Sequence, residues 1–129
     1  MDPVVHFEMP YDDAQRMSKF YQTAFGWKTE TMGAEAGNYV VASTTETGAN
    51  GRPTTPGAIN GGFFQRKADW PAQVPSVVIS VQNIEDAMNK VRAAGGEVLG
   101  EPMDIPHVGK YVSFQDTEGN RVSLLQPLM

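Results

Sequence analysis

The fold is decided by residues 4–27, whose sequence is VVHFEMPYDDAQRMSKFYQTAFGW. Its first six residues, Val4–Met9, predict a strand, because side chains of alternating polarity point to opposite faces of a sheet. His6 and Glu8 then share one face. We expect Pro10 to end this strand, because proline lacks the N–H that a ladder needs.

A helix follows this strand. Asp12 and Asp13 are placed to cap it, because a carboxylate at a helix start accepts hydrogen bonds from free backbone N–H groups. Gly26 is typical of the left-handed residue that ends a helix. Between them, apolar side chains recur at helical spacing and predict one stripe that packs on a sheet: Ala14, Met17, Phe20, Tyr21, Ala24 and Phe25.

The remaining chain continues as strands, a second helix and loops. Further strands are predicted over Trp27–Met32, Asn38–Ser43, Ala58–Gln65, Ser76–Val81, Glu97–Leu99, Lys110–Gln115 and Arg121–Gln126. The second helix begins after Asn83 and ends at Gly95-Gly96, and its predicted apolar stripe is Ile84, Ala87, Met88, Val91 and Ala94. Residues 44–57 are rich in Thr, Gly and Pro, which predicts an exposed loop, and residues 116–120 predict a tight hairpin turn.

A tandem repeat emerges from this order. The helix caps Asp13 and Asn83 are 83 − 13 = 70 positions apart, and so are the glycines Gly26 and Gly96, 96 − 26 = 70. Each half is therefore a β-α-β-β-β unit, with a helix on one face of its sheet and the other face open. We predict an α+β fold in a single domain, 1–129, with half-repeats 1–66 and 75–129, a linker 67–74, and curved mixed sheets around a ligand-binding cleft.

Composition excludes several classes of protein. The chain has 129 residues, and its apolar runs of about five residues are far below the roughly 20 that a membrane span needs. No signal peptide is recognisable, and the absence of cysteine rules out disulfides, thiolate metal sites and a cysteine nucleophile. We therefore expect a cytoplasmic protein without a membrane partner.

The charge balance is acidic. Ten Lys and Arg against 15 Asp and Glu give a formal net charge of −5. Binding to a phosphate backbone requires a basic patch, and Arg66-Lys67 is the only adjacent basic pair. We therefore expect no nucleic-acid partner.

Four features together resemble the glyoxalase, bleomycin-resistance and extradiol-dioxygenase group, also called the vicinal oxygen chelate superfamily. They are His6 seven residues before Asp13, then Phe20-Tyr21, then Phe25-Gly26-Trp27, and the turn at residues 116–120 before the last strand. The Phe-Gly-Trp run is similar to the branch related to lactoylglutathione lyase. The resemblance implies a glyoxalase-like fold, a small-molecule ligand and a homodimer.

The resemblance also implies where a metal would bind. Metal-dependent members hold a divalent ion on the first strand of each half, usually through His, and on the last strand of each half, usually through Glu. Here these places carry His6, Ser76, Gly61 or Gly62, and Ser123. Serine hydroxyls are poor ligands and glycine has no side chain. Only His6 matches, so we assign no cofactor and prefer a metal-free site.

His6 and Glu8 are the candidate catalytic residues. They could be a general base with its orienting carboxylate, two ligands of an unusual metal site, or, as we favour, ordinary pocket-lining side chains. His107 is the only other histidine available as a ligand. It lies in residues 105–110, which could form a lid over the cleft, although a solvent-exposed histidine is the simpler interpretation.

The predicted ligand pocket combines these residues with polar and aromatic side chains that strand alternation places on the open faces. Its members are His6, Glu8, Tyr39, Asn60, Phe64, Ser76, Tyr111 and Ser123. Three functions remain open: a protein that binds a small organic molecule without a conserved metal, a divalent-metal-dependent lyase, isomerase or dioxygenase using His6 and Glu8, and a non-catalytic interaction module. In the third, Tyr39, Phe64 and Tyr111 would plug the cleft.

Overall fold

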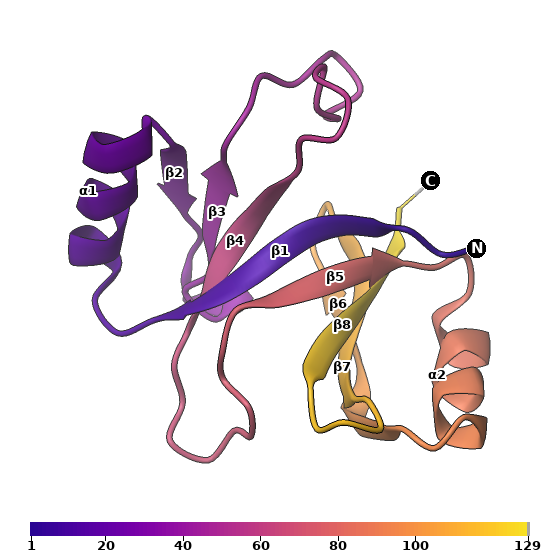
Figure 1. The fold of residues 1–129 in the computed structure, drawn as a ribbon. Helices are drawn as coiled ribbons and strands as arrows, with labels where there is room; N and C mark the ends of the chain where they lie inside the picture. The colour runs from indigo at the N-terminus through magenta and orange to yellow at the C-terminus, as the bar shows by residue number, and fades with distance from the viewer. Residues whose placement is uncertain (129) are drawn as a thin grey trace. The chain divides into compact units, whose positions relative to one another are not determined.

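The structure, a computed structural model, describes residues 1–128 (Figure 1). Its elements follow the order β1 (Val4–Tyr11), α1 (Ala14–Phe25), β2 (Lys28–Thr31), a 3-10 turn η1 (Ala34–Ala36), β3 (Val40–Ser43), β4 (Asn60–Gln65), β5 (Ser76–Ser80), α2 (Ile84–Ala93), β6 (Glu97–Ile105), β7 (Gly109–Gln115) and β8 (Arg121–Pro127). This order confirms the predicted α+β class and the two consecutive β-α-β-β-β modules. Neither helix in residues 1–128 is long and apolar enough to cross a bilayer.

The chain divides into two compact units. Residues 6–70 form what we call the N-terminal unit, and residues 1–5 together with the chain from Pro71 onward form the C-terminal unit. The first five residues join the C-terminal unit because the N–H of Ser80 donates to the carbonyl of Pro3 at 2.9 Å.

In the N-terminal unit the strand order is β2-β3-β4-β1, with β1 and β4 parallel and the other pairs antiparallel. One face of this sheet is covered by α1. Its buried core comprises Tyr11, Val40, Ala42 and Phe63. Tyr21 of α1 stacks on Trp27, with ring centroids 4.6 Å apart and an interplanar angle of 12°. Trp27 is therefore a core residue, as its size favours.

The apolar stripe of α1 is narrower than predicted. Ala14, Met17 and Tyr21 pack on the core, whereas Phe20 and Phe25 are 57% and 65% exposed. Both phenylalanines lie next to the Tyr21 ring, Phe20 at right angles to it with centroids 5.0 Å apart and Phe25 tilted by 33° with centroids 6.1 Å apart. The large ring of Tyr21 covers the sheet that a wider stripe would otherwise contact.

Pro10 does not end β1, which continues to Tyr11. The carbonyl of Tyr11 accepts from the N–H of Arg66, so Tyr11 presents its backbone polar groups to the β4 side. Successive residues of a strand point these groups to opposite sides, and the nitrogen of Pro10 therefore faces away from β4. The missing N–H removes nothing from the β1–β4 ladder.

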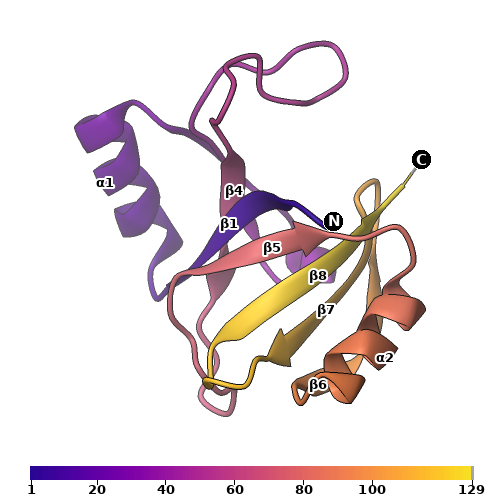
Figure 2. The same ribbon diagram turned by 45° about the vertical axis from the view of Figure 1, so that its right-hand side comes forward.

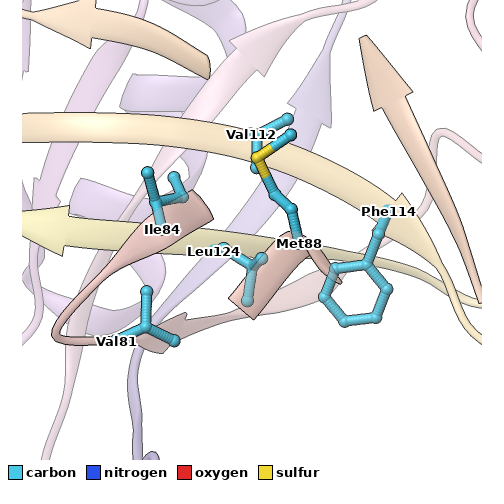
Figure 3. Close-up of a cluster of buried hydrophobic side chains, with 6 residues drawn as sticks. All are labelled: Val81, Ile84, Met88, Val112, Phe114 and Leu124. Carbon is cyan, nitrogen blue, oxygen red and sulfur yellow. The ribbon is translucent and has the colours of Figure 1, made fainter. Parts of the chain in front are cut away.

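In the C-terminal unit the strand order is β5-β8-β7-β6, with β5 and β8 parallel and the other pairs antiparallel. Helix α2 packs on β6, β7 and β8 (Figure 2). Figure 3 shows the core beneath it, made of Val81, Ile84, Met88, Val112, Phe114 and Leu124. Ala94, predicted in the apolar stripe, lies beyond the end of α2 and is exposed.

The two helices begin in the same way and end differently. The side chains of Asp13 and Asn83 each accept from the backbone N–H three residues later, at 3.0 and 2.9 Å. The caps are therefore 70 residues apart, as predicted. Gly26 is left-handed with φ 75°, but its counterpart is Gly95, with φ 100°, rather than Gly96. The glycine spacing is thus 95 − 26 = 69, because α2 is shorter than α1.

Residues 105–110 form the hairpin connection between β6 and β7. Strand β6 runs to Ile105, much further than predicted, and passes a register shift between Leu99 and Met103. A tight turn then leads directly into β7, with the N–H of Val108 donating to the carbonyl of Ile105 at 3.0 Å. His107 has a positive φ of 66° in this turn and its side chain is exposed.

Candidate functional site

Each sheet has one face covered by its helix and one face free of it. On the helix-free face of the N-terminal unit, strand register pairs His6 with Asn60, Glu8 with Gly62, and Pro10 with Phe64. Tyr39 precedes β3 and shares this face with Val41, which pairs with Gly62. We call the set His6, Glu8, Tyr39, Asn60, Gly62 and Phe64 the N-terminal face.

Glu8 lies at the centre of this face and is only 4% exposed. The hydroxyl of Tyr39 donates to its Oε2 at 3.0 Å. Burying a carboxylate costs several kcal/mol unless hydrogen bonds or charges compensate, so proteins seldom place one in an interior without a reason. Strand β1 carries Glu8 into a buried position rather than an exposed one.

Gly62 creates the room for this contact. A Cβ built at Gly62 would overlap the ring and hydroxyl of Tyr39. The phenol therefore lies directly on the glycine backbone and points its hydroxyl at Glu8. The neighbouring Gly61 faces the other way, because a Cβ there would meet Phe7 in the helix-covered core.

His6 lies half-buried two residues before Glu8 on the same strand face. Burial lowers the pKa of its imidazole below 6.5, because charging a ring that has lost water is unfavourable. At neutral pH the ring is therefore uncharged. Within residues 1–128 its side chain forms no hydrogen bond, unlike Glu8.

Asn60, predicted as a pocket residue, also has a structural role. Its Oδ1 accepts from the N–H groups of Thr44 and Thr45, at 2.7 and 3.3 Å. The hydroxyl of Thr44 donates to the carbonyl of Ile59 at 2.7 Å. Asn60 thus closes the base of the loop over residues 44–59.

The helix-free face of the C-terminal unit carries a cluster of hydroxyl groups. The oxygens of Tyr111 and Ser123 lie 2.7 Å apart, and Ser113 lies 3.2 Å from Ser123. Arg121 donates through Nη2 to the Ser113 hydroxyl at 3.3 Å. We call Tyr111, Ser113, Arg121 and Ser123 the C-terminal hydroxyl cluster.

Sequence reasoning found Tyr111 and Ser123 but missed the other two members. The hairpin turn at residues 116–120 fixes the β7–β8 register and so places Ser113 opposite Ser123 and Gln115 opposite Arg121. Counting outward from that turn would have found both. Ser76 is the first residue of β5 and is half-buried. His107 is exposed and lies in the turn between β6 and β7.

The family's metal positions do not carry a matching set of donors. Register settles the last-strand position of the first half as Gly62, since Gly61 faces the core, and Tyr39 covers that glycine. Ser123 belongs to the hydroxyl cluster. Within residues 1–128, no three His, Cys, Asp or Glu side chains gather as a metal-binding group. The donor set of metal-dependent members therefore does not fit this chain.

Comparison with known proteins identifies relatives over most of the chain. The model of the Glyoxalase/Bleomycin resistance protein/Dioxygenase superfamily matches residues 4–124. A glyoxylase-like domain-containing protein of Didymella fabae is 32% identical over 116 residues, covering 88% of this chain and 84% of the relative. A Mycobacterium bovis protein called CFP32, which is provisionally named a glyoxylase, is 33% identical over 111 residues. That match covers 84% of this chain but only 38% of the mycobacterial protein.

Solved structures share the fold at low sequence identity. Streptomyces coelicolor methylmalonyl-CoA epimerase in complex with 2-nitronate-propionyl-CoA superposes with a TM-score of 0.70 and 16% identity, over 98% of this chain and 97% of that one. Methylmalonyl-CoA epimerase from Mycobacterium tuberculosis gives a TM-score of 0.67 and 12% identity, over 98% and 88%. At such identities the likeness describes the fold and not the chemistry.

Proposed function

Because the chain belongs to the Glyoxalase/Bleomycin resistance protein/Dioxygenase superfamily, we propose that it binds a small organic molecule on its helix-free faces, without the family's usual metal ligands. Glu8 and Tyr39 would supply polar contacts on the face of the N-terminal unit, and the C-terminal hydroxyl cluster would supply polar contacts on the face of the C-terminal unit. We also propose that it forms a homodimer, as the resemblance implies. Light scattering on the purified protein measures that state directly.

Buried Glu8 with its Tyr39 hydrogen bond is the observation that carries the proposal. A sheet face without a ligand gains nothing from a carboxylate that is 4% exposed, because an apolar residue there would be cheaper to bury. Polar groups that are retained at such a cost are typical of binding and catalytic sites. The solved complex with 2-nitronate-propionyl-CoA supports a small organic ligand for this fold.

A thermal-shift screen tests the proposal. A ligand that binds only the folded state raises the melting temperature, so a panel of small polar and aromatic compounds should contain at least one that does so. The shift should be lost in Glu8→Gln, which keeps the shape of the side chain and removes its charge. Glu85→Gln, at an exposed position of helix α2, is the matched control and should keep the shift. A panel that leaves the melting temperature unchanged contradicts the proposal.

A divalent-metal-dependent lyase, isomerase or dioxygenase is the second candidate. Uncharged His6 on the same strand face as Glu8 favours it, because neutral imidazole and carboxylate are both metal ligands. Metal analysis of the purified protein distinguishes the two functions. About one ion per chain, lost in His6→Ala, would replace the first proposal with this one.

A non-catalytic interaction module is the third candidate, and Tyr39 favours it. The ring of Tyr39 already occupies the space above Gly62, where a ligand could otherwise lie. If the ring is only a plug, Tyr39→Ala should allow panel compounds to bind that do not bind the wild-type protein. If the ring contacts a ligand, the same substitution should weaken binding.

A further inference from the structure

Asn60 holds the 44–59 loop through one end of its amide group. Its Oδ1 accepts from both Thr44 and Thr45 N–H, and the Thr44 hydroxyl lies 3.5 Å from the same oxygen. Thr44 also reaches across to the carbonyl of Ile59 at 2.7 Å. The two ends of the loop are thus joined at a single side chain.

Beyond this base, the loop bonds to itself. Thr47 and Pro53 form an isolated antiparallel bridge. The N–H of Gly48 donates to the carbonyl of Arg52 at 2.9 Å, and that of Thr54 to the carbonyl of Glu46 at 3.0 Å. Figure 1 shows the loop extending past the ends of β3 and β4. The hydrogen bonds of Thr44 and Thr45 join the loop to β4 at its base, through Asn60.

Asn60 also belongs to the N-terminal face of the candidate site. Asn60 and His6 are register partners on the parallel strands β4 and β1, about 4.8 Å apart, and share the helix-free face. Within the described residues 1–128, neither Nδ2 of Asn60 nor the His6 imidazole has a hydrogen-bond partner. Both side chains are half-buried, so a ligand atom reaching them would be partly removed from water.

We propose that Nδ2 of Asn60 binds a carbonyl oxygen of the ligand beside His6, while its Oδ1 couples that binding to the order of the 44–59 loop. This inference rests on the proposed function and names its ligand class: an apolar or aromatic molecule with an uncharged carbonyl group. An amide N–H₂ that gains an acceptor fixes the plane of the whole amide. The same plane sets the direction in which Oδ1 meets Thr44 and Thr45.

Charge and neighbouring side chains both favour this ligand class. Glu8 lies two residues from His6 on the same face, and its carboxyl group offers no positive charge to an anionic ligand. Burial keeps the imidazole of His6 uncharged at neutral pH by lowering its pKa, so it offers no positive charge to an anion. Phe64 and Val41 supply apolar surface on the same face.

The test compares acetophenone with ethylbenzene, which keeps the ring and the two-carbon side chain but has no carbonyl oxygen. Titrations are followed through the amide signals of Asn60 by nuclear magnetic resonance. One net hydrogen bond should make acetophenone bind about 2- to 10-fold more tightly than ethylbenzene in the wild-type protein. Bound acetophenone should also slow hydrogen exchange at the N–H groups of Thr44 and Thr45.

Two variants distinguish the role of Nδ2 from the role of Oδ1. Asn60→Asp keeps an oxygen acceptor for the loop and removes the N–H₂ donor, so Thr44 and Thr45 should stay protected while the preference for acetophenone disappears. Asn60→Ala should lose both the protection of the Thr44 and Thr45 N–H groups and the preference for acetophenone. Gln65→Glu, also on β4 but exposed, is the matched control and should change neither.

The outcomes are distinguishable. Equal binding of the two compounds to the wild-type protein, or a preference that survives in Asn60→Asp, overturns the role of Asn60 and leaves the proposed function standing. If neither compound gives a saturable shift, this inference fails and the proposed function loses support. A preference without any change in exchange at Thr44 and Thr45 overturns the coupling to the loop.

Discussion

Tyr39 and Tyr111 occupy the same position in the two halves of the chain. In the first half Val41 pairs with Gly62, which pairs with Glu8; in the second, Ser113 pairs with Ser123, which pairs with Val78. Tyr39 lies two residues before Val41, and Tyr111 lies two residues before Ser113. The two tyrosines are 111 − 39 = 72 positions apart, and so are Val41 and Ser113, 113 − 41 = 72. The repeat therefore extends from the helix caps to the helix-free faces.

The two tyrosines use their hydroxyl groups differently because their neighbours differ. Tyr39 lies over Gly62 and reaches across it to Glu8. Tyr111 meets the side chain of Ser123, which stands where the first half has Gly62. One half therefore presents a buried carboxylate and the other a group of hydroxyls.

Gly62→Ala should destabilise the protein. The added methyl would overlap the Tyr39 phenol, so the ring must move and its hydrogen bond to Glu8 is lost or weakened. Overpacking of this kind costs about 1 to 3 kcal/mol in the free energy of unfolding, measurable by urea denaturation. Gly48→Ala is the control: its Cβ would meet only ordinary contacts, the nearest at 3.5 Å. Equal losses in both variants would contradict the steric explanation.

Tyr39→Phe should remove one donor from the buried carboxylate. Leaving a buried group with one hydrogen bond fewer costs about 1 to 3 kcal/mol of unfolding free energy, again measured in urea. Tyr21→Phe loses only a 3.9 Å contact from the hydroxyl to the sulfur of Met9, so it should cost much less. The prediction is wrong if both substitutions prove equally mild.

His6 should make stability fall in mild acid. Its folded-state pKa lies below the unfolded value of 6.5, so the unfolded chain binds the proton more readily. The stabilising contribution is complete above about pH 6.5 and is lost as the pH falls towards the lowered pKa. His6→Gln should flatten this part of the profile of melting temperature against pH. His107→Gln, at an exposed position, should leave the profile of the wild-type protein unchanged.

Asp13→Ala should cost about 1 kcal/mol of unfolding free energy, because the first turn of α1 loses the acceptor for the N–H of Arg16. Asp13→Asn keeps a side-chain oxygen and should restore most of the loss. Asp12→Ala is the neighbouring control. It breaks only an exposed ion pair with Arg66, 3.0 Å long, which contributes less than about 1 kcal/mol. Denaturation curves in which Asp12→Ala is the more harmful change would refute this assignment of the cap.

Local signals in the sequence were sufficient for the starts of the two helices and for the order of the elements. A helix cap depends on one side chain and the N–H groups next to it, so Asp13 and Asn83 could be recognised without any knowledge of the sheet. The exposure of Phe20 could not be predicted. It depends on how much of the sheet the ring of Tyr21 covers, which is a property of packing.

The sequence predicted several residues of the candidate site but not the contacts that these residues make. Alternation placed Glu8, Tyr39 and Asn60 on open faces, and register now puts all three on one helix-free face. The hydrogen bond between Glu8 and Tyr39 depends on Gly62, which only the β1–β4 pairing brings beneath the ring. The bond from Asn60 to Thr44 joins residues 16 positions apart, beyond the reach of any local pattern.

The contact between Tyr39 and Gly62 also constrains how this lineage can change. Any larger side chain at position 62 would collide with the phenol, so it could be tolerated only alongside a smaller residue at position 39. Two substitutions would have to arise together, each harmful without the other. Any attempt to reshape this face should therefore exchange positions 39 and 62 as a pair.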